Sequence, residues 1–391
     1  MTHDHAQSEP ASPGGNQHDA RISGAQLAVL LVADDLTGVC DSALAFVKAG
    51  LSAFVQTDAR ACAGLQQCAV WAISAESRNL QPDEAAPRMA ALSLPQVGPG
   101  TLLFHKVDSA GRGNPGEELL ALASRWQCEA VVYAPAYPSA GRTVQAGQLR
   151  VRDFAGQDRA LNLLDKIPHT GRAHCARIDA ESVDGRRQQI QNALSAGQSI
   201  LLCDAVTQAD LERTVSAAQA LPQRLLWCGS AGLAEAVARS LQAREVNRME
   251  QPAAARTLVI SGTDHAVTRA QMRALAGGLQ PGHAPLECLQ KSIAVELDWS
   301  KTSAETIYTL WRQQAAAKPA LLLTGGDTAS FVLRVLGATG LRLGGEVEAG
   351  VPWGVIVDGA AAGSMVMTKS GGFGGEQTLI RAVEFARQGE A

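Results

Sequence analysis

Two adjacent carboxylates at the end of an apolar run are the residues of this chain best suited to chemistry. The run Leu30–Ala33 ends at Asp34 and Asp35, and Thr37 and Gly38 follow directly. Ligands bind outside the carboxyl ends of the strands in an open α/β sheet, so we expect a site here. Two like charges at a strand end cost free energy unless a cation, a basic residue or a substrate hydroxyl uses them. The alternative is structural: Asp35 or Thr37 caps a helix by accepting a backbone N–H.

A second set of polar side chains follows another apolar run: Lys106, Asp108, Ser109, Arg112 and Asn114. Because Arg can bind a carboxylate with two hydrogen bonds and Lys supplies a point charge, we expect an anionic small molecule as the ligand. The alternative is a solvated loop with a surface ion pair. A third candidate is the loop Ala134–Arg142, which two prolines stiffen and which carries Tyr137, Ser139 and Arg142. Its alternative is a rigid structural turn.

Three loops in the last third of the chain combine glycines and hydroxyls and carry few charges. Their candidate residues are Ser261, Gly262 and Thr263; Gly325, Gly326, Asp327 and Thr328; and Lys369, Ser370, Gly371, Gly372 and Gly374. Each loop precedes an expected helix, and small residues there let backbone N–H groups approach phosphate oxygens. The three loops together predict phosphate binding. The sequence has no Gly-x-x-x-x-Gly-Lys-Ser/Thr motif, which excludes a P-loop nucleotide site.

The elements that must position these residues alternate between short apolar runs and stretches of helical period. We expect strands at Leu27–Ala33, Ala53–Gln56, Ala69–Ser74, Leu102–Val107, Ala130–Ala134, Ile200–Cys203, Leu225–Cys228, Leu258–Ser261, Ala320–Leu323 and Gly354–Val357. We expect helices at Asp41–Ala49, Asp83–Leu92, Gly116–Arg125, Asp184–Leu194, Leu211–Ala220, Ala231–Gln242, Thr268–Leu275, Ala304–Ala317, Ala329–Leu336 and about 376–387. Such alternation predicts an α/β protein with two domains, largely parallel sheets and a ligand cleft between them.

The domain boundaries follow from composition. Residues 1–24 are polar and lack the basic start and apolar centre of a signal peptide, so we expect a disordered tail. Residues 244–256 break the alternation with mixed charge and a proline, and they predict a linker. The first domain then spans 25–243 and the second 257–391.

Composition narrows the partners of the chain. A net charge of −4 gives no reason to expect nucleic acid or an anionic membrane, and no apolar run approaches the ~18–20 residues of a membrane span. The eight cysteines are scattered without a Cys-x-x-Cys pair, which is typical of a reducing cytosol and predicts a cytoplasmic protein. The local cluster of His169, His174 and Cys175 is a weak candidate for a metal site.

Seven ordered motifs together resemble the four-carbon acid sugar kinase family, from about Leu27 to Arg387. In the first domain they are Ala33–Gly38 followed by Asp41, Lys106–Asn114, Ala134–Arg142 and Gly229–Ala234. In the second domain the family's glycine loops are matched by Ser261–Thr263, Gly325–Thr328 and Lys369–Gly374. The chain departs from the family pattern at Ala110, Gly111, Asp327 and Gly372, and its stretch 151–176 is short.

The resemblance implies an ATP- and Mg²⁺-dependent kinase that phosphorylates the terminal hydroxyl of threonate, erythronate, 3-oxo-tetronate or a similar acid. The first domain would bind the sugar acid and the second the nucleotide. Asp35 or Asp34 would orient or deprotonate the acceptor hydroxyl or help to hold the metal, and Lys106 and Arg112 would bind the carboxylate of the acid. The glycine loops would hold the phosphates, as phosphoryl transfer relies on positioning and charge neutralisation.

Two other functions stay open at this point: a non-catalytic binder of sugar acids on the same fold, and a metal-dependent sugar-acid aldolase or dehydratase. Tight binding of ATP with Mg²⁺ to the second domain distinguishes the kinase from both. The sequence leaves open which acid is the substrate, which residues bind metal and whether the chain forms a homo-oligomer.

Overall fold

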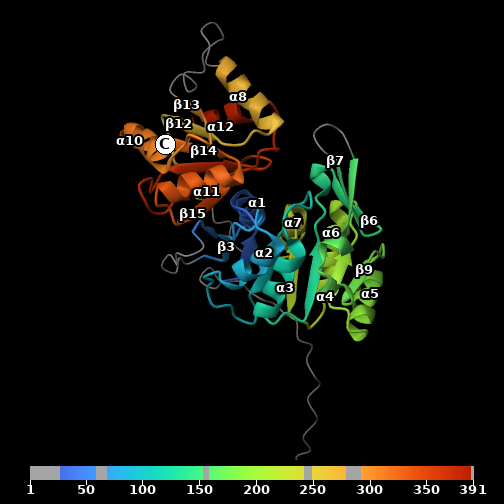
Figure 1. Cartoon of the computed structure of the whole chain (residues 1–391). Helices are drawn as coiled ribbons and strands as arrows, with labels where there is room; N and C mark the ends of the chain where they lie inside the picture. The colour runs from blue at the N-terminus through green and yellow to red at the C-terminus, as the bar shows by residue number, and fades with distance from the viewer. Residues whose placement is uncertain (1–26, 59–67, 153–157, 242–248, 279–291, 389–391) are drawn as a thin grey trace, which may run out of the picture.

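The computed structural model describes residues 27–58, 68–152, 158–241, 249–278 and 292–388. Within these ranges the chain forms a 14-stranded sheet with the order β13-β12-β14-β17-β16-β15-β2-β3-β1-β4-β11-β5-β10-β9, and a separate three-stranded sheet β6-β7-β8 (Figure 1). The predicted tail, 1–24, and part of the predicted linker, 244–248, lie outside the described residues. Residues 249–256 form neither helix nor strand.

The bounds of the elements are as follows. The strands of the large sheet are β1 Val29–Ala33, β2 Ala53–Gln56, β3 Val70–Ser74, β4 Leu102–Lys106, β5 Ala130–Ala134, β9 Cys175–Ile178, β10 Ile200–Cys203, β11 Leu225–Gly229, β12 Thr257–Ser261, β13 Ile293–Glu296, β14 Ala320–Thr324, β15 Gly340–Glu348, β16 Val351–Ile356 and β17 Met365–Lys369. The small sheet consists of β6 Arg142–Gln145, β7 Gln148–Arg152 and β8 Asp158–Asn162. The helices are α1 Leu36–Lys48, α2 Pro82–Ala90, α3 Pro115–Arg125, α4 His169–Arg172, α5 Val183–Ser195, α6 Gln208–Gln219, α7 Ala231–Ser240, α8 Ala266–Gly278, α10 Ala304–Gln314, α11 Gly326–Val335 and α12 Thr378–Arg387.

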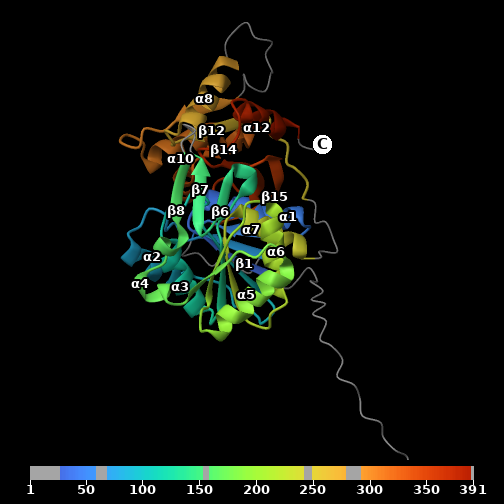
Figure 2. The same ribbon diagram turned by 90° about the vertical axis from the view of Figure 1, so that its right-hand side faces the viewer.

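The first half of the chain has the predicted parallel architecture. The strands from β2 to β9 in the sheet order above are parallel to one another. Helices α1, α7, α6 and α5 pack in a row on one face, and α2 packs with α3 on the other (Figure 2). The apolar runs of the strands are continuous because helices cover both faces of the sheet. All five residues of β1, for example, are buried.

The two halves share one sheet, which corrects the prediction of a separate sheet in each domain. Strands β13, β12, β14 and β17 are parallel, while β15 runs antiparallel to both β16 and β2 and so joins the halves. The segment Gly340–Glu348 combines glycines with charged residues, and its pairing partner Ala53–Gln56 is remote in the sequence. Neither property gives a local strand signal.

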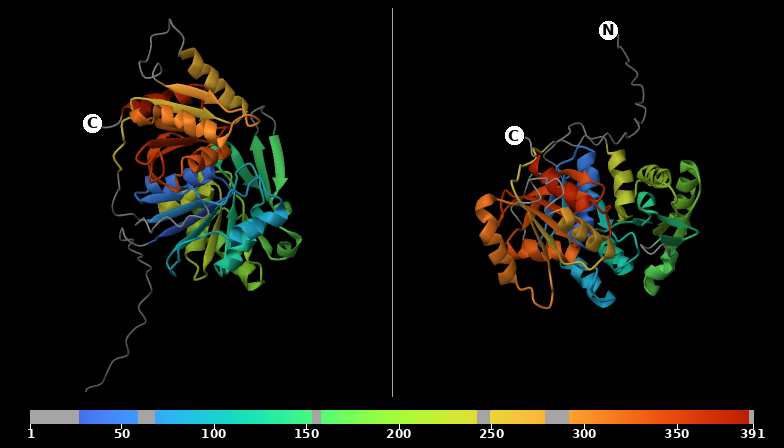
Figure 3. Two further views of the ribbon diagram at one scale, coloured as in Figure 1. Left: turned by 60° about the vertical axis from the view of Figure 1, so that its left-hand side comes forward. Right: turned by 90° about the horizontal axis from the view of Figure 1, so that it is seen from above.

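Helix α1 lies where the halves meet. It packs on β1, β2 and β3 of the first half and on α11, β15, β16 and β17 of the second. The small sheet β6–β8 stands beside the C-terminal half (Figure 3). No helix in the described part of the chain has the length and apolar character needed to cross a membrane.

The strand register gathers the predicted site loops at two edges. Ala33 pairs with Ser74 on one side and Lys106 on the other, so the loops after β1, β3 and β4 begin at the same level. In the second half, Thr324 pairs with Ser261 and Lys369, so the three glycine-rich loops also begin together. Parallel register therefore builds both sets of loops from distant segments.

Candidate active site

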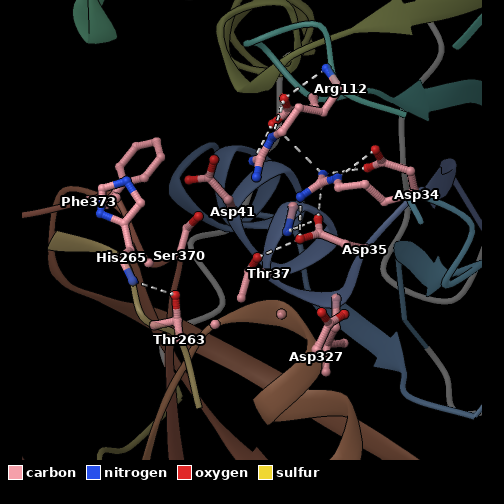
Figure 4. A pocket seen from close by; sticks show the side chains of 18 of the residues that line it. Asp34, Asp35, Thr37, Asp41, Arg112, Thr263, His265, Asp327, Ser370 and Phe373 are labelled. Atoms are coloured by element: carbon pink, nitrogen blue, oxygen red, sulfur yellow. Dashed lines mark hydrogen bonds and ion pairs between the residues drawn. The ribbon is translucent and has the colours of Figure 1, made fainter. Parts of the chain in front are cut away.

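One cavity of about 850 Å³ brings the two sets of loops together. The predicted residues that line it are Asp34, Asp35, Thr37, Lys106, Asp108, Ser109, Arg112, Arg142, Gly262, Thr263, Gly325, Gly326, Asp327, Thr328, Ser370, Gly371 and Gly372. In Figure 4 the carboxylates and Arg112 stand on one side of the cavity, and Thr263 and Asp327 stand on the other. The site thus has a charged wall from the first half and a glycine-rich wall from the second.

The acidic pair lines the cavity, and Asp35 also caps a helix. Asp35 is the N-cap of α1 and accepts hydrogen bonds from the backbone N–H of Gly38 and the hydroxyl of Thr37, both at 2.8 Å. Asp34, the last residue before it, is almost fully buried. Burial raises the pKa of the Asp34 carboxyl above its ordinary value, and the neighbouring Arg78 opposes this increase. Asp35 thus caps the helix and, together with Asp34, still lines the cavity.

Arg78 holds both carboxylates, and sequence analysis missed it. Its Nε and Nη2 donate to Asp34 at 2.8 and 2.7 Å, and its Nη1 and Nη2 donate to Asp35 at 2.6 and 2.8 Å. Although burial opposes it, the two carboxylates raise the pKa of Arg78 well above its ordinary value. The available signal was position: Arg78 follows β3, the strand that pairs with β1. A buried acidic pair needs such a cation.

Two further arginines line the charged wall. Arg112 donates through Nε and Nη2 to Asp108, both at 2.9 Å. Burial raises the pKa of Asp108, but the Arg112 hydrogen bonds and the nearby cations outweigh it and hold this pKa well below its usual range. Arg142 donates from Nη1 to Ser109, lies 5.8 Å from the centre of the Phe373 ring, and has a buried Nε without a hydrogen-bond partner. Arg142 is thus the less satisfied of the two guanidinium groups.

The glycine-rich wall is tightly packed against the charged wall. A Cβ at Gly326, the first residue of α11, would lie 2.8 Å from Asp35 Oδ2. A Cβ at Gly371 would lie 2.8 Å from the Thr263 hydroxyl. Gly325 has a φ of +96°, a conformation that glycine adopts readily. The backbone at the start of α11 therefore lies close to Asp35.

Four predicted residues support the loops without lining the cavity. Lys369 is fully buried beneath the third loop, where its Nζ donates to the carbonyl oxygens of Ser370 at 2.9 Å and Phe373 at 3.2 Å. Burial lowers its pKa to about 8. The other three are Asn114, which donates to Leu80, Ser261 at the end of β12, and Gly374 at a φ of +83°.

The structure adds cavity residues that the prediction of the site omitted. Trp299 is 46% exposed, donates its indole N–H to Gly262 at 2.6 Å and meets the Phe331 ring edge-to-face at 5.5 Å between centroids. Asp41 also lines the cavity, although the sequence motif only placed it after Gly38. Arg152 and Arg159 come from the small sheet β6–β8, which the sequence did not predict.

A charged wall and a glycine-rich wall line one cavity of this α/β protein. Comparison with known proteins agrees with this division. A family model described as a sugar-binding N-terminal domain matches residues 29–237, and one described as a nucleotide-binding C-terminal domain matches residues 280–379.

Curated relatives match almost the whole chain. A D-threonate kinase of Bordetella bronchiseptica is 30% identical, with 92% of this chain and 97% of the relative covered. A 3-oxo-tetronate kinase of Pseudomonas fluorescens is 26% identical, with 92% and 97% covered. A crystal structure of a Haemophilus influenzae protein shares the fold, with a TM-score of 0.64 at 20% identity and coverage of 91% and 100%. The chain belongs to the four-carbon acid sugar kinase family, and it is a phosphotransferase.

Proposed function

We propose that this kinase transfers the γ-phosphoryl group of ATP to the terminal hydroxyl of a four-carbon sugar acid such as threonate, erythronate or 3-oxo-tetronate. The observation that carries the proposal is the pairing of the two walls across one cavity: charged side chains on one side and glycine loops on the other. Family membership favours this function over a non-catalytic binder and over an aldolase or dehydratase.

The carboxylate of the acid would bind at the charged wall, with Arg142 as its main contact. Its buried Nε lacks a partner, and an unsatisfied buried donor is stabilised by a ligand that accepts its hydrogen bond. The fork of Arg112 already binds Asp108. Lys106 adds a second positive charge, with its Nζ 2.9 Å from the carbonyl oxygen of Val107. On this basis we propose that Arg112 positions Asp108 and that Arg142 binds the substrate carboxylate.

The phosphates of ATP would lie against the glycine loops, and the adenine against Trp299. The loops after β12, β14 and β17 start at one edge of the parallel strands, where ligands bind in such sheets. Trp299 lies at the same edge, three residues after the end of β13, and its indole is fixed by Gly262 and Phe331. An exposed, fixed indole beside phosphate-binding loops suits the flat face of a purine.

A magnesium ion would be held by Asp327 together with phosphate oxygens. Asp327 is exposed in the first turn of α11, with one carboxylate oxygen 3.5 Å from the Asn79 amide. Mg²⁺ in kinases commonly uses one or two carboxylates plus substrate phosphates, so this donor set fits. The ion would neutralise phosphate charge when bound.

The test is a coupled assay of ADP formation with purified protein, ATP and Mg²⁺ over four- to six-carbon sugar acids, starting with D-threonate. We expect one or a few four-carbon acids to raise ADP release far above the rate without acid, and ³¹P NMR to find the phosphate on the terminal carbon. A protein that binds ATP but phosphorylates none of the acids would refute the proposal.

A further inference from the structure

Asp41 is an ionisable side chain of the cavity for which neither the sequence motifs nor the family comparison gives a role. It lies in α1, one and a half turns after the acidic pair. Figure 4 shows its carboxylate between Thr37 and the loop with Ser370 and Phe373, below Arg112 and above Thr263. It therefore lies between the cations expected to hold the acid and the loops expected to hold the phosphates.

The carboxylate of Asp41 has the accepting capacity that the acidic pair lacks. Every oxygen of Asp34 and Asp35 accepts at least one hydrogen bond from Arg78, and both oxygens of Asp35 accept a second from its own loop. Among the described residues, none donates a hydrogen bond to the Asp41 carboxylate. The Arg78 guanidinium also opposes protonation of Asp34, because its positive charge stabilises the ionised form.

The surroundings of Asp41 favour a base that works near neutral pH. Burial raises the pKa of Asp41 to about 6. Lys106 at the end of β4 and Lys48 on α1 oppose this increase, while Glu235 on α7 and Glu346 on β15 add to it. The phenol of Tyr137 and the guanidinium of Arg142 also face the carboxylate from the loop after β5 and from β6. A general base is most effective when its pKa lies near the working pH.

We propose that Asp41 is the general base for the acceptor hydroxyl, an inference that rests on the proposed kinase function. As the hydroxyl oxygen forms its bond to the γ-phosphorus, its proton passes to a carboxylate oxygen of Asp41. The bond from the γ-phosphorus to the bridging oxygen breaks, and ADP leaves with that electron pair. Asp41 then releases the proton to solvent. Asp34 and Asp35, held by Arg78, position the N-terminus of α1 and Thr37 at the cavity.

The test compares the pH dependence of kcat/KM for the acid substrate in wild type and three variants, at saturating ATP and Mg²⁺. We expect a wild-type rate that falls below a pH near 6, because the base must be ionised. Asp41→Asn should lose ~10²–10⁴ in kcat and the acidic limb, with nucleotide and acid affinities kept in calorimetry. Retained affinities also show that this variant is folded.

Two variants outside the cavity move the limb in opposite directions. Glu235→Gln removes a like charge and should shift the limb to lower pH, whereas Lys48→Met removes an opposite charge and should shift it to higher pH. Both should keep the wild-type rate at high pH. These shifts test the assignment even if Asp41→Asn fails to fold.

The outcomes separate the base from the function. The assignment of the base is overturned if the wild type is active and Asp41→Asn keeps its rate and its acidic limb. It is also overturned if neither charge variant moves the limb. In both cases the kinase function is left intact. A wild type that phosphorylates no acid overturns both.

Discussion

Arg78 is the residue whose removal tests the architecture of the charged wall most directly. The change Arg78→Gln deletes four hydrogen bonds of 2.6–2.8 Å and leaves two carboxylates side by side without the guanidinium that pairs with both. The side chain of Arg78 is only 12% exposed, so water cannot easily replace it. Removal of one partner from such a buried ion pair costs about 3–5 kcal/mol. We expect the free energy of unfolding of Arg78→Gln to be lower than that of the wild type by this amount at pH 7.5.

The loss should shrink as the pH falls. Without Arg78, burial and mutual repulsion raise the folded-state pKa of the Asp34 carboxyl further above its unfolded value. A carboxyl with a raised pKa binds more protons in the folded state, so acidification favours folding. Each pH unit between the raised pKa and the unfolded pKa returns about 1.4 kcal/mol as the pH falls through it. The Arg78→Gln variant should therefore recover part of its stability between pH 7.5 and 5.5, relative to wild type at each pH.

Urea unfolding followed by circular dichroism at the two pH values measures both effects. The matched control is Arg239→Gln, which removes an exposed arginine paired with Glu212 and should cost ~0–1 kcal/mol at either pH. A penalty for Arg78→Gln no larger than that of the control, or one that grows on acidification, would refute the reasoning.

Three further variants probe the proposed ligand contacts. Arg142→Lys keeps the charge but loses the planar fork, so calorimetry should find acid affinity ~10- to 150-fold lower and nucleotide affinity unchanged; equal losses for both ligands would contradict this. Gly371→Ala places a Cβ 2.8 Å from a hydroxyl and should weaken ATP binding by roughly tenfold (about 1.4 kcal/mol), whereas Gly375→Ala, with nothing within 4 Å, should not. Trp299→Ala should cost about 1–3 kcal/mol of nucleotide binding by loss of stacking; an unchanged affinity would place the adenine elsewhere.

The parallel strands could be predicted because each is a short, continuous apolar run covered on both faces. The predictions Ala53–Gln56, Ala130–Ala134 and Ile200–Cys203 match β2, β5 and β10 residue for residue. Helix α1 was predicted to start at Asp41 but begins at Leu36, because Asp35 caps it immediately after β1. A prediction of the helix start from the apolar pattern alone, without the cap, places the first helical residue one turn or more too far along the chain.

The remaining features depend on contacts between distant segments. Strand β15 exists because it pairs with β2 and β16, and its glycines and charges hide it from any local pattern. The hairpin strands β6–β8 were missed because their short runs mix arginines, glutamines and apolar residues. Arg78 belongs to no glycine or acidic motif, and only the pairing of β3 with β1 brings it to the acidic pair. The loops of the site were predictable as motifs, whereas Arg78, the cation that neutralises the acidic pair, was not.

Substrate binding should itself strengthen the proposed base. In the free protein, Arg78 offsets the acidic pair and Arg112 offsets Asp108, whereas Lys106 and Arg142 interact electrostatically with Asp41. The carboxylate of a bound sugar acid would share these two cations and offset the effect by which Lys106 lowers the pKa of Asp41. The pKa of Asp41 should then be higher in the complex than in the free protein. At saturating ATP, kcat reports the enzyme with the acid bound and kcat/KM for the acid reports the enzyme before the acid binds. The acidic limb of kcat should therefore lie at higher pH than that of kcat/KM. Arg142→Lys binds the acid less well and so leaves more positive charge facing Asp41 in the complex. The pH difference between the two acidic limbs should therefore be smaller in this variant. If the two limbs coincide in the wild type, the acid does not bind beside Asp41.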